Sequence, residues 1–218
     1  MDLIVHGFIF DLDGLMVNSE GLSLQAWRRV LAPYGRSLEE ADYFVLIGQD
    51  SQASAAHVIE RLGVPLTWEQ LAQAHWHELM AVFDRELRPR PGLLALVGAL
   101  VGAGYPLAIA SNSPSDYVQQ ALAAIGLRET FQCVIGRDQV ARGKPAPDVY
   151  LAAAAGLNLP PAECLAFEDS PAGLQAAVAA GMRCIVVPNE HLPHADFTSA
   201  YLRCENLALA QAALAGLL

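Results

Sequence analysis

Positive charge is scarce in this sequence. Only 13 of its 218 residues are Lys or Arg, against 23 Asp or Glu, which gives a formal net charge of −10 at pH 7. A chain of this charge repels a nucleic-acid backbone and an anionic membrane surface, because both present dense negative charge. We therefore expect neither nucleic acid nor membrane among its partners, and a small anionic ligand must find a local positive site.

Paired cysteines and a basic leader are also missing. Four cysteines, at positions 133, 164, 184 and 204, stand far apart and form no CxxC pair, which argues against a disulfide framework or a cysteine zinc site. The amino-terminal residues lack the positive charge that opens a secretory signal. Reduced, buried thiols and the absence of an export signal predict a cytoplasmic protein.

Long uninterrupted hydrophobic segments are lacking too, although residues 91–110 contain no charged side chain. The segment is broken by glycines at 102 and 104 and by Pro106. It leaves about 11 helical residues, or about 16 Å, against a bilayer core of about 30 Å. We interpret it as a helix, a turn and a buried strand of a globular protein, in which 54% of the residues are hydrophobic.

Short apolar runs alternate with helical segments along most of the chain. Strands are predicted at residues 3–10, 107–110, 165–167 and 184–187, with a weaker one at 131–135, because these runs are near-continuous and rich in strand-forming residues. Helices are predicted at 93–103, 115–125, 147–155 and 171–180. Alternation of this kind is typical of an α/β protein with a doubly wound, Rossmann-like parallel sheet.

One interval breaks the alternation. Between Asp13 and Ser111 lie 97 residues, whereas one strand–helix–strand unit takes about 30. This interval contains only helical patterns, at 20–34, 50–62 and 67–86, where Thr67 and Gln70 can form a capping box. We predict a catalytic core of residues 1–17 and 88–218 with an all-helical cap domain of residues 18–87 inserted over the carboxyl edge of the sheet.

Acidic side chains gather where the predicted strands end. Asp11 and Asp13, two residues apart on an extended chain, point to the same side. Gly14 allows the backbone to turn sharply after them. Glu168 and Asp169 follow another strand. At about 4 Å and an effective dielectric of about 20, each like-charge contact costs on the order of 4 kcal/mol, so the cluster needs a cation. Oxygen ligands favour Mg²⁺.

Lys144 can supply a fixed positive charge from a loop constrained by Gly143 and Pro145, where its ammonium can meet a phosphate oxygen. With this lysine, four motifs stand in order, each at a predicted strand end or loop: Asp11-Leu12-Asp13-Gly14, Ser111-Asn112, Lys144-Pro145 and Glu168-Asp169-Ser170. In these motifs the sequence resembles the haloacid dehalogenase superfamily, and within it the phosphatases and β-phosphoglucomutase-like proteins with a helical cap. The resemblance covers nearly the whole chain.

The resemblance implies a chemical role for each motif. Asp11 would be the nucleophile that forms an aspartyl-phosphate, and Asp13 the general acid and base. Ser111 and Asn112 would bind the phosphoryl group, which Lys144 would bridge to the nucleophile. The cofactor Mg²⁺ would rest on Asp11, the main-chain carbonyl of Asp13, and Asp169, with Glu168 as a direct or water-mediated ligand. The predicted reaction is Mg²⁺-dependent hydrolysis of a small phosphomonoester resembling a sugar phosphate.

Two alternatives remain open. A phosphomutase of the β-phosphoglucomutase type shares the core, but such relatives usually carry arginine after the cap glycine, where this chain has Gln49. They also place a histidine near positions 22 and 23, which are Leu and Ser here. A catalytically silent phosphate-binding protein should have lost Asp11, Asp13 or Lys144, and all three are present.

The cap offers candidates for substrate specificity. Where the family's cap and hinge approach the leaving group, this sequence places Asn18, Glu20, Gln49 and Asp50. A second strong anion on the substrate is disfavoured by the acidic residues of the cap, namely Glu39, Glu40, Asp42 and Asp50. The expected partner is a small phosphorylated metabolite, and the sequence specifies neither which ester it is nor the oligomeric state.

Overall fold

A parallel sheet forms the centre of the molecule. The computed structural model describes residues 4–189, 191–192 and 195–216. Within these residues six strands lie in the order β3-β2-β1-β4-β5-β6, and every neighbouring pair is parallel. Their bounds are β1 Gly7–Phe10, β2 Leu107–Ala110, β3 Cys133–Ile135, β4 Cys164–Glu168, β5 Arg183–Val186 and β6 Leu202–Arg203. The predicted doubly wound α/β fold is confirmed.

The central strands are buried on both faces, as their apolar sequences predict. Every residue of β1, β2 and β4 is buried. Phe10 of β1 stacks on Phe167 of the adjacent β4, with ring centroids 4.6 Å apart. Stacking of this kind between neighbouring strands adds to the hydrophobic stabilisation of the sheet.

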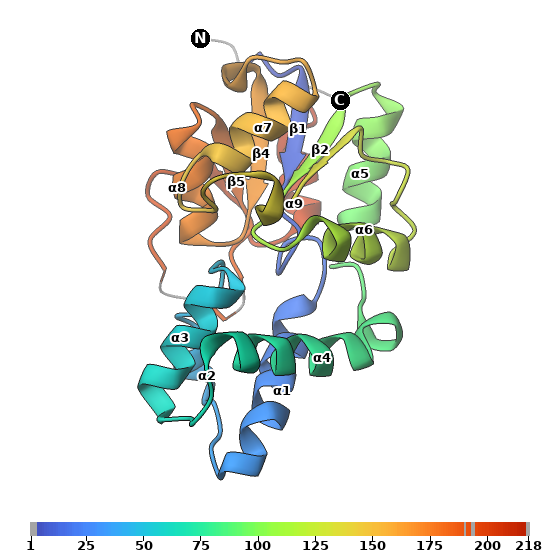
Figure 1. Ribbon diagram of the computed structural model, residues 1–218. Helices are drawn as coiled ribbons and strands as arrows, with labels where there is room; N and C mark the ends of the chain where they lie inside the picture. Colours follow the sequence, from blue (N-terminus) through green and yellow to red (C-terminus); the bar gives the residue numbers. More distant parts are fainter. Residues whose placement is uncertain (1–3, 190, 193–194, 217–218) are drawn as a thin grey trace.

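Helices cover both faces of the sheet (Figure 1). Helices α5 (Leu93–Gly102), α6 (Ser115–Ala124) and α9 (Leu207–Ala213) contribute apolar residues to the core on one face. Helices α7 (Asp148–Gly156) and α8 (Pro171–Ala179) do so on the other. Ser170 caps α8 by accepting a hydrogen bond from the main-chain N–H of Gly173.

A second group of helices follows β1 and lies beyond the carboxyl end of the sheet (Figure 1). It comprises α1 (Ser19–Leu31), α2 (Glu40–Tyr43), α3 (Ser51–Leu62) and α4 (Trp68–Glu86). These helices share an apolar core of their own, in which Trp27 and Leu71 are buried. The predicted capping box of Thr67 and Gln70 begins α4. The helical segment falls within residues 18–87, and the division into two domains remains a prediction.

Some elements differ from the sequence predictions. Helix α2, strand β6 and helix α9 were not predicted, because each is short and weakly patterned. Strand β1 begins at Gly7 rather than at residue 3, which itself lies outside the described residues. None of the described helices combines the length and apolarity needed to cross a membrane. The four cysteines are free, and all but the half-buried Cys133 are buried.

Candidate active site

The residues predicted for catalysis, phosphate binding and metal binding meet at the carboxyl edge of the sheet. Strands β2 and β4 flank β1 on opposite sides, which makes this edge a topological switch point, where open α/β sheets bind ligands. Asp11 follows β1, Ser111 follows β2, and Asp169 follows β4. One pocket is lined by six of the residues predicted for catalysis, phosphate binding or metal binding, namely Asp11, Asp13, Ser111, Asn112, Lys144 and Asp169.

Lys144 joins two of the acidic residues of the site. Its side-chain Nζ donates hydrogen bonds to Asp11 Oδ1 at 2.5 Å and to Glu168 Oε1 at 2.6 Å. The lysine is 7% exposed. Burial by itself would lower the pKa of Lys144, but the negative charges of Asp11 and Glu168 outweigh it and hold this pKa above its ordinary value. The ammonium therefore stays charged, between two carboxylates that come from different strands.

One ammonium does not neutralise the acids around it. Asp11, Glu168 and Asp169 each offer a carboxylate oxygen, and these oxygens lie within 4.8 Å of one another. Burial, followed by repulsion from neighbouring carboxylates, raises the pKa of Asp169 well above its ordinary value. Burial raises the pKa of Asp11 too, although Lys144 opposes this rise. The residual negative charge and the all-oxygen donor set fit a hard divalent cation such as Mg²⁺.

Glu168 is fully engaged by protein donors. Its Oε1 accepts hydrogen bonds from Lys144 Nζ and from the hydroxyl of Tyr150, each at 2.6 Å. Its Oε2 accepts from the hydroxyl of Ser170 at 3.2 Å and from the main-chain N–H of Asp169 at 3.1 Å. These bonds suit Glu168 for orienting the lysine. A direct bond from Glu168 to a metal would compete with them.

Asp169 is held differently. Its Oδ2 accepts a hydrogen bond from Asn189 Nδ2 at 2.7 Å. The chain at Gly14 passes so near that a Cβ atom there would lie 2.1 Å from the same oxygen, and φ of Gly14 is 77°. Glycine is therefore required at this position for both space and backbone conformation.

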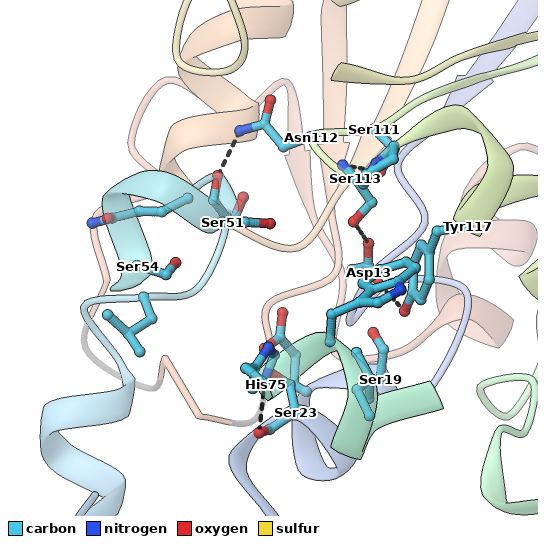
Figure 2. A pocket seen from close by; sticks show the side chains of 18 of the residues that line it. Asp13, Ser19, Ser23, Ser51, Ser54, His75, Ser111, Asn112, Ser113 and Tyr117 are labelled. Carbon is cyan, nitrogen blue, oxygen red and sulfur yellow. Dashed lines mark hydrogen bonds between the residues drawn. The ribbon is translucent and has the colours of Figure 1, made fainter. Parts of the chain in front are cut away.

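Asp13 lies on the cap side of the site and is fixed by two hydroxyl groups. Ser113 Oγ donates to its Oδ2 at 2.7 Å, and the Tyr117 hydroxyl donates to its Oδ1 at 2.8 Å. Figure 2 shows these three side chains converging at the pocket wall. Tyr117 in turn packs against Trp76 of α4, with ring centroids 5.4 Å apart. The candidate acid is thus linked to the cap through an aromatic contact.

Asn112 joins separate parts of the chain. Its side-chain Nδ2 donates to the carbonyl oxygens of Gly48 at 2.7 Å and of Lys144 at 3.1 Å, and its Oδ1 accepts from the Lys144 main-chain N–H at 2.7 Å. A side-chain contact between Asn112 and phosphate would have to replace one of these bonds. The predicted phosphate-binding role of Asn112 stays a prediction.

The four specificity candidates divide into two pairs. Glu20 and Gln49 line the active-site pocket. Asn18 is not among its lining residues; its side chain instead bonds the main chain of Glu86 and Arg88, where the helical segment returns to the core. Asp50 is not a lining residue either, because its carboxylate caps α3 through the N–H of Ala53.

Several pocket residues were not among the predicted site residues. Among them are Ser113, Tyr117, Ser19, Ser23, Tyr43 and His75. The hydroxyl of Tyr43 donates a short hydrogen bond to Glu20. Burial raises the pKa of Glu20 to about 7 in spite of that bond. His75 stacks on Trp27 with ring centroids 4.1 Å apart, and burial lowers its pKa to about 4. The cap end of the pocket therefore presents hydroxyls and a neutral imidazole.

Comparison with known proteins defines the class to which this fold and site belong. The sequence profile of the haloacid dehalogenase-like hydrolases matches residues 8–187, so the chain belongs to this family. Protein CbbY of Rhodobacter capsulatus is 35% identical over 94% of this chain and 95% of its own length. The fructose-1-phosphate phosphatase YqaB of Escherichia coli is 34% identical over 83% of this chain and 95% of its own length.

Coverage differs between relatives. The chain spans only 48% of the bifunctional riboflavin kinase/FMN phosphatase of Arabidopsis thaliana, to which it is 31% identical over 83% of its residues. Among solved structures, CbbY from Rhodobacter sphaeroides in complex with phosphate has a TM-score of 0.85 at 29% identity, covering 95% of this chain and 98% of that one. A variant of that protein was solved with xylulose-(1,5)bisphosphate. These findings confirm the predicted family and agree with the prediction of a phosphoric monoester hydrolase.

Proposed function

We propose that this protein is a Mg²⁺-dependent phosphatase that hydrolyses a small sugar phosphate-like monoester through an aspartyl-phosphate on Asp11. The observation that carries the proposal is the pair of hydrogen bonds from Lys144 Nζ to Asp11 and Glu168 inside a buried acidic cluster. An ion pair on the protein surface could form beside many different residues, because solvent screens its charges. A buried lysine between two carboxylates, beside a third carboxylate, is costly for folding and calls for a functional reason.

The reaction has two displacements. Asp11 attacks phosphorus and forms the acyl phosphate, while Asp13 gives a proton to the leaving ester oxygen. Asp13 then takes a proton from the water that attacks the same phosphorus, and phosphate is released. The hydrogen bonds from Ser113 and Tyr117, which hold the Asp13 side chain in the pocket, support this role. The hydroxyl of Ser111, which lines the pocket, and the ammonium of Lys144 stabilise the phosphoryl oxygens.

The residues present fit a magnesium ion. Asp11 and Asp169 would hold it together with the main-chain carbonyl of Asp13, and Asn189 keeps the Asp169 carboxylate in place. When bound, Mg²⁺ neutralises charge on the phosphoryl oxygens and on the carboxylates around them. Glu168 acts on the lysine instead, because both of its oxygens already accept hydrogen bonds from the protein.

Hydrolysis is tested with purified protein and Mg²⁺ on p-nitrophenyl phosphate and a panel of sugar phosphates. Asp11→Asn serves as the matched blank, because it keeps the shape of the side chain and removes the nucleophile. We expect Mg²⁺-dependent release of phosphate by the wild-type protein and none by the variant. A phosphorylated form of the protein should be detectable in the wild type and absent from the variant. Equal release by both proteins would refute a nucleophilic Asp11. Isomerisation of a sugar phosphate without free phosphate would identify a phosphomutase.

A further inference from the structure

The cap end of the active-site pocket has a distinct chemical character. The residues that α1 to α4 contribute to the pocket lining are rich in hydroxyl groups and include two indole rings; they are Ser19, Ser23, Tyr43, Ser51, Ser54, Trp27 and Trp76. Figure 2 shows serine side chains from α1 and α3 around this end, with His75 of α4 between them. Hydroxyls and aromatic faces suit a leaving group that carries hydroxyls and C–H surface.

One of these hydroxyls is poorly satisfied. Ser19 is 4% exposed and lines the pocket, and its Oγ has no partner of good hydrogen-bond geometry among the described residues, although it interacts with the hydroxyl of Tyr117. Leaving a buried polar group unsatisfied is costly, so such atoms are rare in folded proteins. A substrate hydroxyl placed at Ser19 would satisfy this atom.

His75 lines the same end of the pocket. Its Nε2 lies 3.2 Å from the carbonyl oxygen of Ser23, and because a carbonyl only accepts, this nitrogen carries the proton. Nδ1 is then the accepting nitrogen of a neutral ring. Burial lowers the pKa of His75, so the imidazole supplies no positive charge near neutral pH.

The pocket also lacks a second fixed cation. Among its described lining residues Lys144 is the one lysine or arginine, and that ammonium is already bonded to Asp11 and Glu168. Glu20 and Asp13 line the pocket as acids. The acidic residues that the sequence suggested for repelling a second anion do not line it: Asp42 pairs with Arg61, and Glu40 with His191. Glu20, in contrast, lines the pocket itself.

We propose that the pocket selects esters with a single phosphate and an uncharged leaving group bearing several hydroxyls, which Ser19, Glu20 and His75 recognise, and that it excludes a second phosphate. This inference rests on the proposed phosphatase function. It separates the chain from the relative that was solved with a bisphosphate. Above about pH 7, where the Glu20 carboxyl is ionised, a second phosphate would meet two acids and an uncharged imidazole where a bisphosphate site requires arginine or lysine.

The first test compares two substrates that differ in one phosphate. With the wild-type protein and saturating Mg²⁺, we expect kcat/KM for fructose 1-phosphate to exceed that for fructose 1,6-bisphosphate by about 100-fold or more, since like charges in a partly buried site repel strongly. Comparable kcat/KM values for the two would overturn the inference. Failure to hydrolyse either sugar ester or p-nitrophenyl phosphate would instead refute the proposed function, and the inference with it.

The second test uses variants. Ser19→Ala should lower kcat/KM for fructose 1-phosphate about tenfold, mainly through KM, because one hydrogen bond to the substrate is lost. The loss for p-nitrophenyl phosphate should be clearly smaller than that for fructose 1-phosphate, since that leaving group offers no hydroxyl to Ser19. Ser37→Ala, at an exposed cap position, is the matched control.

Glu20→Gln tests the repulsion of a second phosphate. The ratio of kcat/KM for fructose 1-phosphate to that for fructose 1,6-bisphosphate should fall about tenfold in this variant, because it removes one of the two acids. An unchanged preference in Glu20→Gln, or equal losses on both substrates in Ser19→Ala, would contradict the assignment.

Discussion

The side-chain amide of Asn112 in the core donates a hydrogen bond to the carbonyl oxygen of Gly48, between α2 and α3, with an N···O distance of 2.7 Å. The same side chain accepts from the main-chain N–H of Lys144. Gly48 has φ of 81°, and a Cβ there would come within 3.1 Å of Ser170 Oγ, at the start of α8. Asn112 therefore links the loop between α2 and α3 to the main chain of Lys144.

Substitutions at Asn112 should reveal this coupling. Asn112→Ala removes all three bonds, and we expect kcat/KM to fall about 10- to 100-fold, because Lys144 and the cap loop lose a shared support. Asn112→Asp keeps the acceptor for the Lys144 N–H but sets a carboxylate against two carbonyl oxygens. The kcat/KM of Asn112→Asp should fall at least as far as that of Asn112→Ala. Steady-state kinetics at several Mg²⁺ concentrations measure both variants, and activity of Asn112→Ala near that of the wild type would dismiss the coupling.

Removing the lysine should leave the buried acids without a neutralising positive charge. Lys144→Ala leaves Asp11 and Glu168 without their cation, and we expect a loss of about 3–5 kcal/mol in the free energy of unfolding at pH 8. Since the pKa of Lys144 is held above its ordinary 10.5, the ammonium stabilises the wild type fully across pH 5–8.

The pH dependence of the Lys144→Ala variant comes from the acids. The pKa of Asp11 is already raised by burial and rises further without the lysine, so ionising this carboxyl costs more as pH increases. The destabilisation should therefore be smaller at pH 5 than at pH 8. Urea unfolding at both values measures it, and a deficit that grows toward pH 5 would show that the sign is wrong.

The acidic cluster predicts opposite effects on stability and activity at Asp169. Asp169→Asn removes one of three crowded carboxylates, so the metal-free variant should melt about 2–4 °C or more above the metal-free wild type. Mg²⁺ should raise the melting temperature of the wild type and barely change that of the variant, whose turnover should fall at least about 100-fold. Thermal melts with and without Mg²⁺ measure this, and an equal Mg²⁺ response in both proteins would place the metal elsewhere.

Glu20 predicts a stability difference that changes with pH. Its pKa is raised from 4.5 to about 7 by burial, so the folded protein binds this proton more tightly than the unfolded chain. The wild type therefore loses stability as pH rises from about 4.5 to about 7, and Glu20→Gln is spared that loss. The free energy of unfolding of the variant should rise relative to that of the wild type by on the order of 2 kcal/mol across this window. Above the window this difference should stay constant. A flat difference from pH 4 to 8 would contradict the buried carboxyl.

Much of this organisation was readable from the sequence. Strand β2 spans the predicted residues 107–110, and α4 begins at its predicted capping box, since local apolar runs and cap residues specify both. The order of the motifs along alternating strands also predicted that Asp11, Lys144 and Asp169 would meet, because parallel strands end at one edge.

What the sequence did not predict are the partners that hold these groups. Tyr150 reaches Glu168 from α7, Asn189 reaches Asp169 from beyond β5, and Tyr117 reaches Asp13 from α6. The pairs are 18 to 104 residues apart, and a tyrosine or asparagine in a helix or loop has no local pattern that announces such a contact. Only the packed structure brings each donor to its carboxylate.

The chain crosses between the sheet and the cap helices twice, and the two crossings are tied together as a short ribbon. Arg90 N–H donates to the carbonyl of Met16, Asn18 N–H to that of Arg88, and Val17 faces Pro89 in an antiparallel bridge. Two independent linkers would let a helical bundle slide and twist over the sheet. We expect a paired ribbon to bend as one unit, which would restrict movement of the cap helices over the pocket mainly to one hinge-like direction.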